Sequence, residues 1–200
     1  MTYTLPFTGK TRLTCPFGKA GSWQAGFHIG VDLVGEADKL VHPIAAGTVE
    51  SMNAHGSAYG NHVCVKHGDG KVSLYAHLAA VNVKKGQRVT VNHVLGRMGA
   101  TGNATGPHLH LEVHRGAYRY PAAGSSPEQC SWLLNPAAVL GIKNTVGEVK
   151  RVVKEMTAVE AAQYVKEKAG LDENTMRFVG AYKYGNELVI KLAAAMEKGD

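Results

Sequence analysis

The 200-residue sequence lacks long hydrophobic runs and has few cysteines and aromatic residues. No stretch approaches the roughly 20 apolar residues that a membrane-spanning helix needs, so we expect no membrane span. The segment MTYTLPFTGKTRLTC at the start has no apolar core of the signal-peptide type. Three cysteines, Cys15, Cys64 and Cys130, are too few and too unevenly numbered for a disulfide framework. None lies in a Cys-x-x-Cys pattern, so we do not expect them to bind a metal.

Negative charge is scarce in the first 145 residues, which hold 13 Lys and Arg but only 7 Asp and Glu. They carry the whole net charge of +6, because residues 146–200 hold nine of each sign. All ten histidines lie at or before His114. Such a segment suits an anionic partner, either nucleic acid or the acidic polymers of a bacterial wall. No nucleic-acid-binding motif accompanies the charge, so we expect no nucleic-acid partner.

Helical periodicity is weak before residue 143, where short β-type runs alternate with turns, and 19 of the 24 glycines precede Val146. We predict that residues 1–143 form one mainly β domain, an antiparallel sheet closed as a sandwich or barrel. Within it, SPEQCSWLL at 126–134 is predicted to form a short helix on the sheet. The predicted strands cover residues 27–35, 47–52, 61–68, 71–78, 87–91 and 108–113.

Residues 144–200 have a helical pattern instead. Thr157 and Glu160 have the spacing of a capping box, and Gly170 suits the end of that helix. Two further amphipathic stretches follow. We therefore predict a small module of three helices over 144–200, which contacts the bacterial wall or mediates self-association, or simply extends the packing of the first domain.

The segment TGNATGPHLHLEV, residues 101–113, contains two histidines spaced by one residue. Alternation with Leu109 and Leu111 indicates a strand, which places His108 and His110 on one face. Two further candidates lie upstream. His28 and Asp32 are four residues apart in FHIGVD, where the β-branched neighbours favour a strand and again a shared face.

His77 is the remaining candidate, at the end of the β-type run KVSLYAHL. Each of these features alone is weak, because a single histidine in a strand is more often structural than a ligand. The segment HLHLEVHRG also has a superficial likeness to a cupin metal site. That alternative leaves His28 and Asp32 unexplained, and the cupin glutamate lies further downstream than Glu112.

Taken together, the motifs resemble the lysostaphin-type zinc metallopeptidases, which are peptidoglycan endopeptidases with a duplicated-hybrid-motif β-fold. The likeness spans residues 17–140, and His-x-x-x-Asp together with His-x-His in GPHLHLEV is its most specific part. The matching segments are FHIGVD, AAGTV, YGNHVCVKHGDGKVSLYAHL, VKKGQRV, LGRMGATGNATGPHLHLEV and LNPAAVL. Asn92 stands where the family usually has a glycine at a turn, a position that asparagine tolerates even in the left-handed conformation.

The resemblance implies that His28, Asp32 and His110 bind Zn²⁺, a ligand set expected of a catalytic zinc. It also implies that His77 and His108 handle the proton of the attacking water and hold the oxyanion. Which of the two is the general base stays open. The implied activity is zinc-dependent hydrolysis of peptide bonds in peptidoglycan cross-links or stem peptides. The alternative is a non-catalytic wall-binding or activator homologue.

Further expectations concern setting and neighbouring residues. The absence of a signal-peptide pattern suggests a phage or prophage endolysin, made in the cytoplasm and released to the wall through a membrane lesion. Glu112 is expected to be structural or to support the site rather than act as the base. The other histidines are expected mostly at the surface or in turns, with His114 as a candidate for the rim of the cleft. Trp23, Phe27 and Tyr59 are expected to line a groove or to pack in the core.

Overall fold

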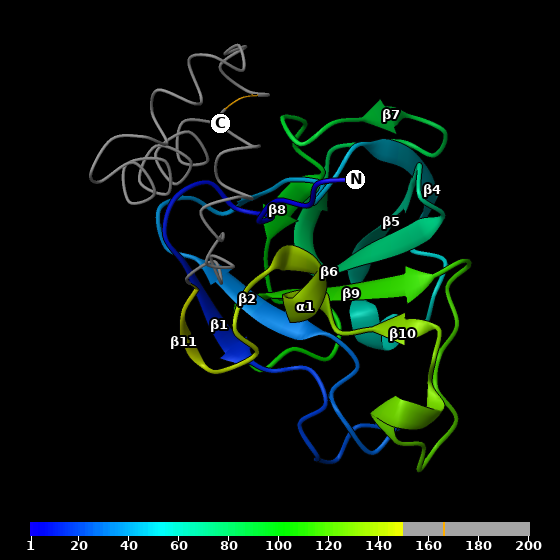
Figure 1. The fold of residues 1–200 in the computed structure, drawn as a ribbon. Coiled ribbons are helices and arrows are strands. Elements are labelled where there is room, and N and C mark those ends of the chain that lie inside the picture. The colour runs from blue at the N-terminus through cyan, green and yellow to red at the C-terminus, as the bar shows by residue number, and fades with distance from the viewer. Residues whose placement is uncertain (150–165, 167–200) are drawn as a thin grey trace, which may run out of the picture. The chain divides into compact units, whose positions relative to one another are not determined.

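The computed structural model describes residues 1–149 and Lys166 (Figure 1). The chain divides into two compact units, Met1–Val152 and Val153–Asp200. Apart from residues 144–149 and Lys166, the predicted three-helix module lies outside the described residues. Among the residues described, no helix has the length and apolar character needed to cross a membrane.

One antiparallel sheet organises the first unit (Figure 1). Its strands follow the order β11-β1-β2-β9-β6-β5-β4-β7, while β10 pairs with β9, and β8 pairs with both β3 and β6. The mainly β fold predicted from the sequence is therefore confirmed. The strands are β1 Thr11–Cys15, β2 Val31–Gly35, β3 Leu40–Val41, β4 Gly47–Met52, β5 Asn61–His67, β6 Lys71–Val81, β7 Arg88–Val89, β8 Gly96–Met98, β9 Leu109–Arg115, β10 Leu133–Leu134 and β11 Gly147–Glu148.

The hairpin β5–β6 shows how local sequence determines this sheet. Gly68, Asp69 and Gly70 connect the two strands, and Gly70 has φ +80°, a conformation that only glycine adopts without strain. Pairing then runs from Lys66 opposite Val72 toward the far end of both strands. Strand β6 of this hairpin also pairs with β9, where Ala76 lies opposite His110. The hairpin therefore lies beside the strand that carries His110.

Hydrophobic side chains cover both faces of the sheet, in two separate clusters. Alternate residues of β9, Leu109, Leu111 and Val113, are fully buried in the larger cluster. Burial of one such side chain contributes about 1.5–3 kcal/mol. The smaller cluster, with Phe27 and Leu74 among its members, lies on the opposite face. Phe27 thus packs in the core, one of the two expectations for it.

Short helical turns lie outside the sheet. The helix predicted over 126–134 is only a 3-10 turn, Pro127–Gln129, and the end of that segment forms strand β10. Pro127 starts the turn but cannot donate a backbone hydrogen bond, and pairing with β9 captures the two leucines that follow. Within residues 1–149 the only α-helix is α1, Pro136–Leu140, which Asn135 caps by accepting a hydrogen bond from the backbone of Ala137.

The sheet continues beyond residue 143. Strand β11, Gly147–Glu148, pairs with β1. Asn144 exchanges hydrogen bonds with the backbone of Phe17, accepting from its N–H at 3.0 Å and donating to its carbonyl at 2.9 Å. The structure therefore places residues 144–149 with the sheet rather than with a helical module. Asn92 lies in a turn but not in the left-handed conformation, so the expected glycine is not needed there.

Candidate metal centre and active site

Two adjacent strands, β2 and β9, and the loop before β2 bring the predicted metal ligands together on the face of the smaller cluster. Asp32 of β2 lies directly opposite His110 of β9 in the antiparallel register, and directly opposed residues share a face. His28 was expected on the same strand as Asp32. It lies instead in the loop before β2, held by backbone hydrogen bonds with Lys19 and Gly18. The loop folds back so that the imidazole of His28 still reaches the carboxylate.

The three ligand atoms are close enough to bind one ion. His28 Nε2 lies 3.1 Å from Asp32 Oδ1 and 3.1 Å from His110 Nδ1. The distance from His110 Nδ1 to Asp32 Oδ1 is 2.9 Å. Tetrahedral zinc with ligands at about 2.0–2.1 Å separates neighbouring ligand atoms by about 3.4 Å. The spacing of the three ligand atoms is therefore close to that in a zinc shell and slightly shorter.

The far side of each imidazole is already occupied. His28 donates from Nδ1–H to the carbonyl of Pro16 at 3.0 Å, and His110 donates from Nε2–H to Glu112 Oε1 at 3.0 Å. With Nδ1–H of His28 and Nε2–H of His110 committed to these acceptors, the neutral imidazoles would turn lone pairs at His28 Nε2 and His110 Nδ1 toward Asp32, as metal binding requires. In that state two nitrogen lone pairs and a carboxylate oxygen converge, an arrangement that suits a cation between them. The residues fit Zn²⁺.

The charges of the site are strongly coupled. Burial alone would raise the pKa of Asp32, but hydrogen bonds from His110 and His28 outweigh it and hold the pKa far below its usual value. Burial likewise would lower the pKa of His110, yet its hydrogen bonds to Asp32 and Glu112 raise it to about 9. The carboxylates therefore stay ionised, and the centre attracts positive charge.

Glu112 is the hub of a buried polar network behind the metal ligands. It is fully buried and accepts hydrogen bonds from His110, His114 and Tyr59, the latter two at 2.7 and 2.6 Å. The hydroxyl of Tyr59 also lies 3.1 Å from that of Tyr118. Although burial disfavours its charge, these histidines lower the pKa of Glu112 to about 2. Glu112 therefore supports His110, as expected.

His77 and His108 form a second pair beside the ligands. Their ring centroids are 4.8 Å apart. His77 donates from Nδ1–H to the carbonyl of Thr101 at 2.8 Å, and His108 donates in the same way to Gly106 at 2.8 Å. Both therefore keep a free Nε2 lone pair. His108 Nε2 lies 3.6 Å from Asp32 Oδ1, within reach of an atom bound at the metal.

His77 has an unusual backbone. Its φ of +60° is rare for a residue other than glycine, and such strain costs about 1–3 kcal/mol and is concentrated at functional sites. The pairing of β5 with β6 shifts by one residue at the same place. Burial first, and then the neighbouring His110 and His108, lower the pKa of His77 to about 4, although the hydrogen bond to the carbonyl of Thr101 acts in the opposite direction. The imidazole is therefore neutral at pH 7.

A cleft of about 570 Å³ is lined by His77 and His110. Aromatic side chains form much of its wall, namely Trp23, Tyr59, Tyr118 and Tyr120. Two of the three aromatic residues singled out in the sequence thus line the cleft. All five predicted site residues lie together, with His28, Asp32 and His110 as one group and His77 and His108 as the other.

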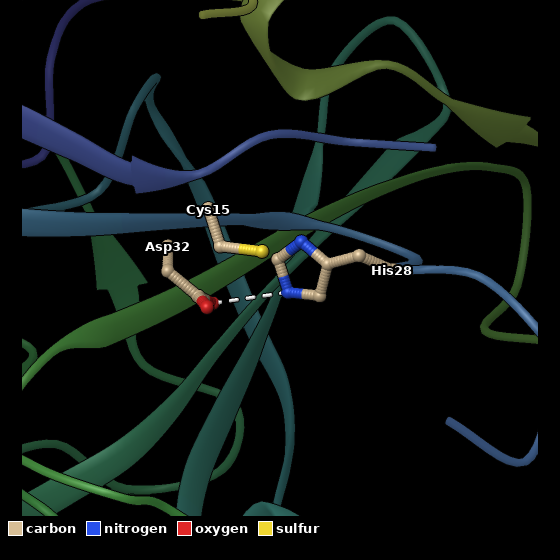
Figure 2. A group of neighbouring side chains, drawn as sticks. All are labelled: Cys15, His28 and Asp32. Atoms are coloured by element: carbon tan, nitrogen blue, oxygen red, sulfur yellow. Dashed lines mark ion pairs between the residues drawn. The ribbon is translucent and has the colours of Figure 1, made fainter. Parts of the chain in front are cut away.

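The structure adds Cys15, which sequence reasoning had set aside. Its Sγ and one ligand atom each of His28 and Asp32 lie within 4.8 Å of one another, and Figure 2 shows the thiol directed toward the imidazole. Burial first, and then the charge of Asp32, raise the pKa of this thiol. The spacing rule that excluded it considers ligands close in sequence, whereas Cys15 reaches the site across strands.

Three of the histidines expected at the surface are buried instead: His62, His67 and His114. Each has a polar partner. His67, for example, contacts Ser73 Oγ at 2.7 Å. His114 lies behind the site rather than at the rim of the cleft, because the polar face of β9 is covered along its whole length. The expectation does hold for His93, which is exposed.

Two imidazoles and a carboxylate that converge beside two further imidazoles and an open cleft form the arrangement expected of metal-dependent hydrolases. Comparison with known proteins gives a more specific match. Residues 26–121 match the model of peptidase family M23, and the fold is similar to that of lysostaphin.

Two solved structures and one curated relative illustrate the likeness. The catalytic domain of lysostaphin from Staphylococcus simulans has a TM-score of 0.55 and 25% identity, over 64% of this chain and 90% of that one. A zinc-containing peptidase from Vibrio cholerae has a TM-score of 0.50 and 28% identity, over 56% and 36%. Peptidoglycan DD-endopeptidase ShyA of Vibrio cholerae is 38% identical over 86 residues, 43% of this chain but 20% of the relative. The chain therefore spans only about a fifth of that relative's length.

Proposed function

We propose that this chain is a zinc-dependent endopeptidase that hydrolyses peptide bonds in bacterial peptidoglycan. The observation that carries the proposal is the convergence of His28 Nε2, Asp32 Oδ1 and His110 Nδ1 within 3.1 Å of one another. The family of residues 26–121 and the peptidoglycan endopeptidase among its relatives support the substrate class.

His28, Asp32 and His110 would hold the zinc ion. When bound, zinc acts as a Lewis acid that polarises the scissile carbonyl and lowers the pKa of water. The protein must then move one proton from that water to the leaving amine. His77 and His108 each offer a free Nε2 lone pair for this step, because each Nδ1–H is committed to a backbone carbonyl.

The same tautomers constrain the oxyanion. An Nε2 lone pair repels a developing negative charge, whereas a protonated Nε2 donates a hydrogen bond to it. The histidine that takes the proton therefore becomes a donor for the tetrahedral species and can return the proton to the amine. The cleft wall of Trp23, Tyr118 and Tyr120 would hold the peptide alongside.

Purified cell walls of several chemotypes test this function. We expect the protein to clear the walls, chelation to stop clearing, and zinc to restore it, while mass spectrometry of the released muropeptides identifies the bond. Walls left intact by zinc-loaded protein that still binds them would support the alternative, a non-catalytic wall-binding or activator homologue. Clearing that is insensitive to chelation would contradict zinc catalysis.

A wall-targeting role for the C-terminal segment also belongs to this proposal. Because β11 ends at Glu148 and pairs with β1, the informative deletion begins after residue 152, at the boundary between the two compact units, and not at residue 144. Loss of wall sedimentation with retained hydrolysis of a soluble peptide would support targeting; unchanged sedimentation would refute it. Size-exclusion chromatography of the full-length and the truncated protein tests self-association.

The endolysin role is tested separately, by expression inside a bacterial host with and without a membrane-permeabilising protein. Lysis that requires both proteins is expected of an endolysin. Lysis by the enzyme alone, or none in either case, would contradict release through a membrane lesion.

A further inference from the structure

We propose that Cys15 is a metal ligand, and that its Sγ coordinates an ion held by His28 and Asp32. The inference goes beyond the proposed peptidase activity and does not depend on it. Figure 2 shows the three side chains converging from strand β1, the loop before β2, and β2 itself.

A β-bulge aims Cys15 at the site. In β1, Leu13 pairs with Leu33, so a regular antiparallel register would pair Cys15 with Val31. Val31 is a fully buried member of the larger hydrophobic cluster. The register shifts between Leu13 and Cys15, and Cys15 pairs with Asp32 instead. One inserted residue therefore transfers the thiol from the core face to the face of the metal ligands.

A register shift also redirects His77, the second candidate site residue that departs from the alternation of its strand. Tyr75 and Leu78 of β6 both lie in the larger cluster. Strict alternation would put His77 with Tyr75 in that cluster, yet His77 lies at the cleft, where the β5–β6 register shifts and φ is +60°. Bulges are typical next to active sites because they redirect one side chain. Cys15 and His77 are redirected to the same site from opposite sides of the β2–β9 pair.

The chemistry of Cys15 matches its neighbours. Thiolate, imidazole and carboxylate are the three ligand types that zinc binds in proteins, with zinc–sulfur bonds of about 2.3 Å. The three ligand atoms already lie within 4.8 Å of one another. Coordination releases the thiol proton to solvent as the metal–sulfur bond forms, and it needs no oxidant. The other two cysteines are buried in the smaller hydrophobic cluster and serve as controls.

A thiolate in the shell has a consequence for catalysis. Together with His110 it completes a four-ligand set, and closed sets of this kind are structural, whereas catalytic sites keep one position open. Cys15 would thus hold the centre in a closed form that retains the metal. Substrate or solvent must displace the sulfur before hydrolysis.

The test is spectroscopic and uses the full chain loaded with Co²⁺ or Zn²⁺. We expect Co²⁺ to give a near-ultraviolet thiolate-to-cobalt absorption band in the wild type and in Cys130→Ala. The band should be absent in Cys15→Ser, whose metal dissociation constant should rise more than about tenfold, the scale on which zinc sites respond to lost support. X-ray absorption of the zinc-loaded wild type should show one sulfur neighbour.

Two results would overturn the inference: a wild-type shell of nitrogen and oxygen only, or a thiolate band that persists in Cys15→Ser. The absorption experiment needs no variant, so it decides the matter even if Cys15→Ser fails to fold. Inactive protein that shows the sulfur neighbour would refute the peptidase proposal and leave this one standing. Active protein without sulfur would do the reverse.

Discussion

Strand β9 presents two faces that are both removed from solvent but have opposite chemistry. Leu109, Leu111 and Val113 enter the larger hydrophobic cluster with no exposed area. On the other face, Glu112 is equally buried and His110 is 6% exposed. The apolar face needs only volume and shape, and dispersion contacts suffice.

The polar face survives burial for a different reason. Polar groups there need partners, since a buried unsatisfied donor or acceptor costs about 1–3 kcal/mol, and among the described residues of this face only His114 Nδ1 is left without one. Glu112 accepts three hydrogen bonds, two from histidines and one from Tyr59. One face of β9 therefore stabilises the fold, while the other positions the side chains of the candidate metal site. Substitutions on the two faces should therefore have separable effects.

Among substitutions on the two faces of β9, His110→Ala should have the largest effect on activity. The variant should lose zinc and wall-clearing activity together, with activity reduced about 10³-fold or more, because several kcal/mol of transition-state stabilisation disappear with the metal. Elemental analysis and a clearing assay measure the two losses. Activity that survives without bound zinc would contradict the assignment.

His108→Ala should keep its zinc and lose activity by about 10²–10⁴-fold, the usual contribution of a positioned acid or base. The side chain is held through Gly106 and is not among the three metal ligands. His77→Ala is the matched comparison, and the variant with the larger loss in turnover identifies the general base. Zinc loss from His108→Ala would show that it is a ligand instead.

Leu111→Ala tests the apolar face. It should lower the free energy of unfolding by about 2–5 kcal/mol through lost burial and a residual cavity. Zinc content and turnover per folded molecule should stay close to those of the wild type at a temperature where the variant is folded. Denaturant unfolding and elemental analysis provide the readouts; a selective loss of zinc would break the division between the faces.

Glu112→Gln should have an intermediate effect on the metal, weakening zinc affinity about 10–100-fold through loosened support of His110. It should also change the acid response of the fold. The hydrogen bonds from His110 and His114 lower the pKa of Glu112 from 4.5 to about 2. A lowered pKa stabilises the fold above the unfolded value, and this stabilisation is lost as pH falls from about 4.5 toward 2.

In the Glu112→Gln variant that part of the pH dependence should be flattened, as measured by denaturant unfolding of metal-free protein between pH 5 and 2. The wild type analysed in parallel is the control. An unchanged slope would mean that Glu112 does not carry the effect.

The smallest effect is expected for Tyr118→Phe. Its hydroxyl lies 3.1 Å from that of Tyr59, at the outer end of the polar network. Loss of one hydrogen bond should cost about 0.5–1.5 kcal/mol of stability with zinc content unchanged. A pronounced loss of turnover without a change in zinc content would assign Tyr118 to the substrate instead.

Much of this was predictable from the residues. Alternation in HLHLEV correctly separated Leu109 and Leu111 from His108 and His110, because the side-chain period of a strand is a local property. The turn at Gly70 is equally local. Comparison of His-x-x-x-Asp and His-x-His with a known family named the five site residues. Alternation could not show that the polar face is also covered, so His114 was expected at a rim rather than beneath the site.

The amino-acid sequence by itself therefore determined the strand periodicity, the candidate ligand types and the match of residues 26–121 to the model of peptidase family M23. The position of His28 in a loop, the burial of Glu112 and the approach of Cys15 depended on tertiary structure. The reason is that a bulge and a cross-strand pair are set by the register between distant segments. A one-residue shift in that register turns a side chain to the other face without changing the local pattern.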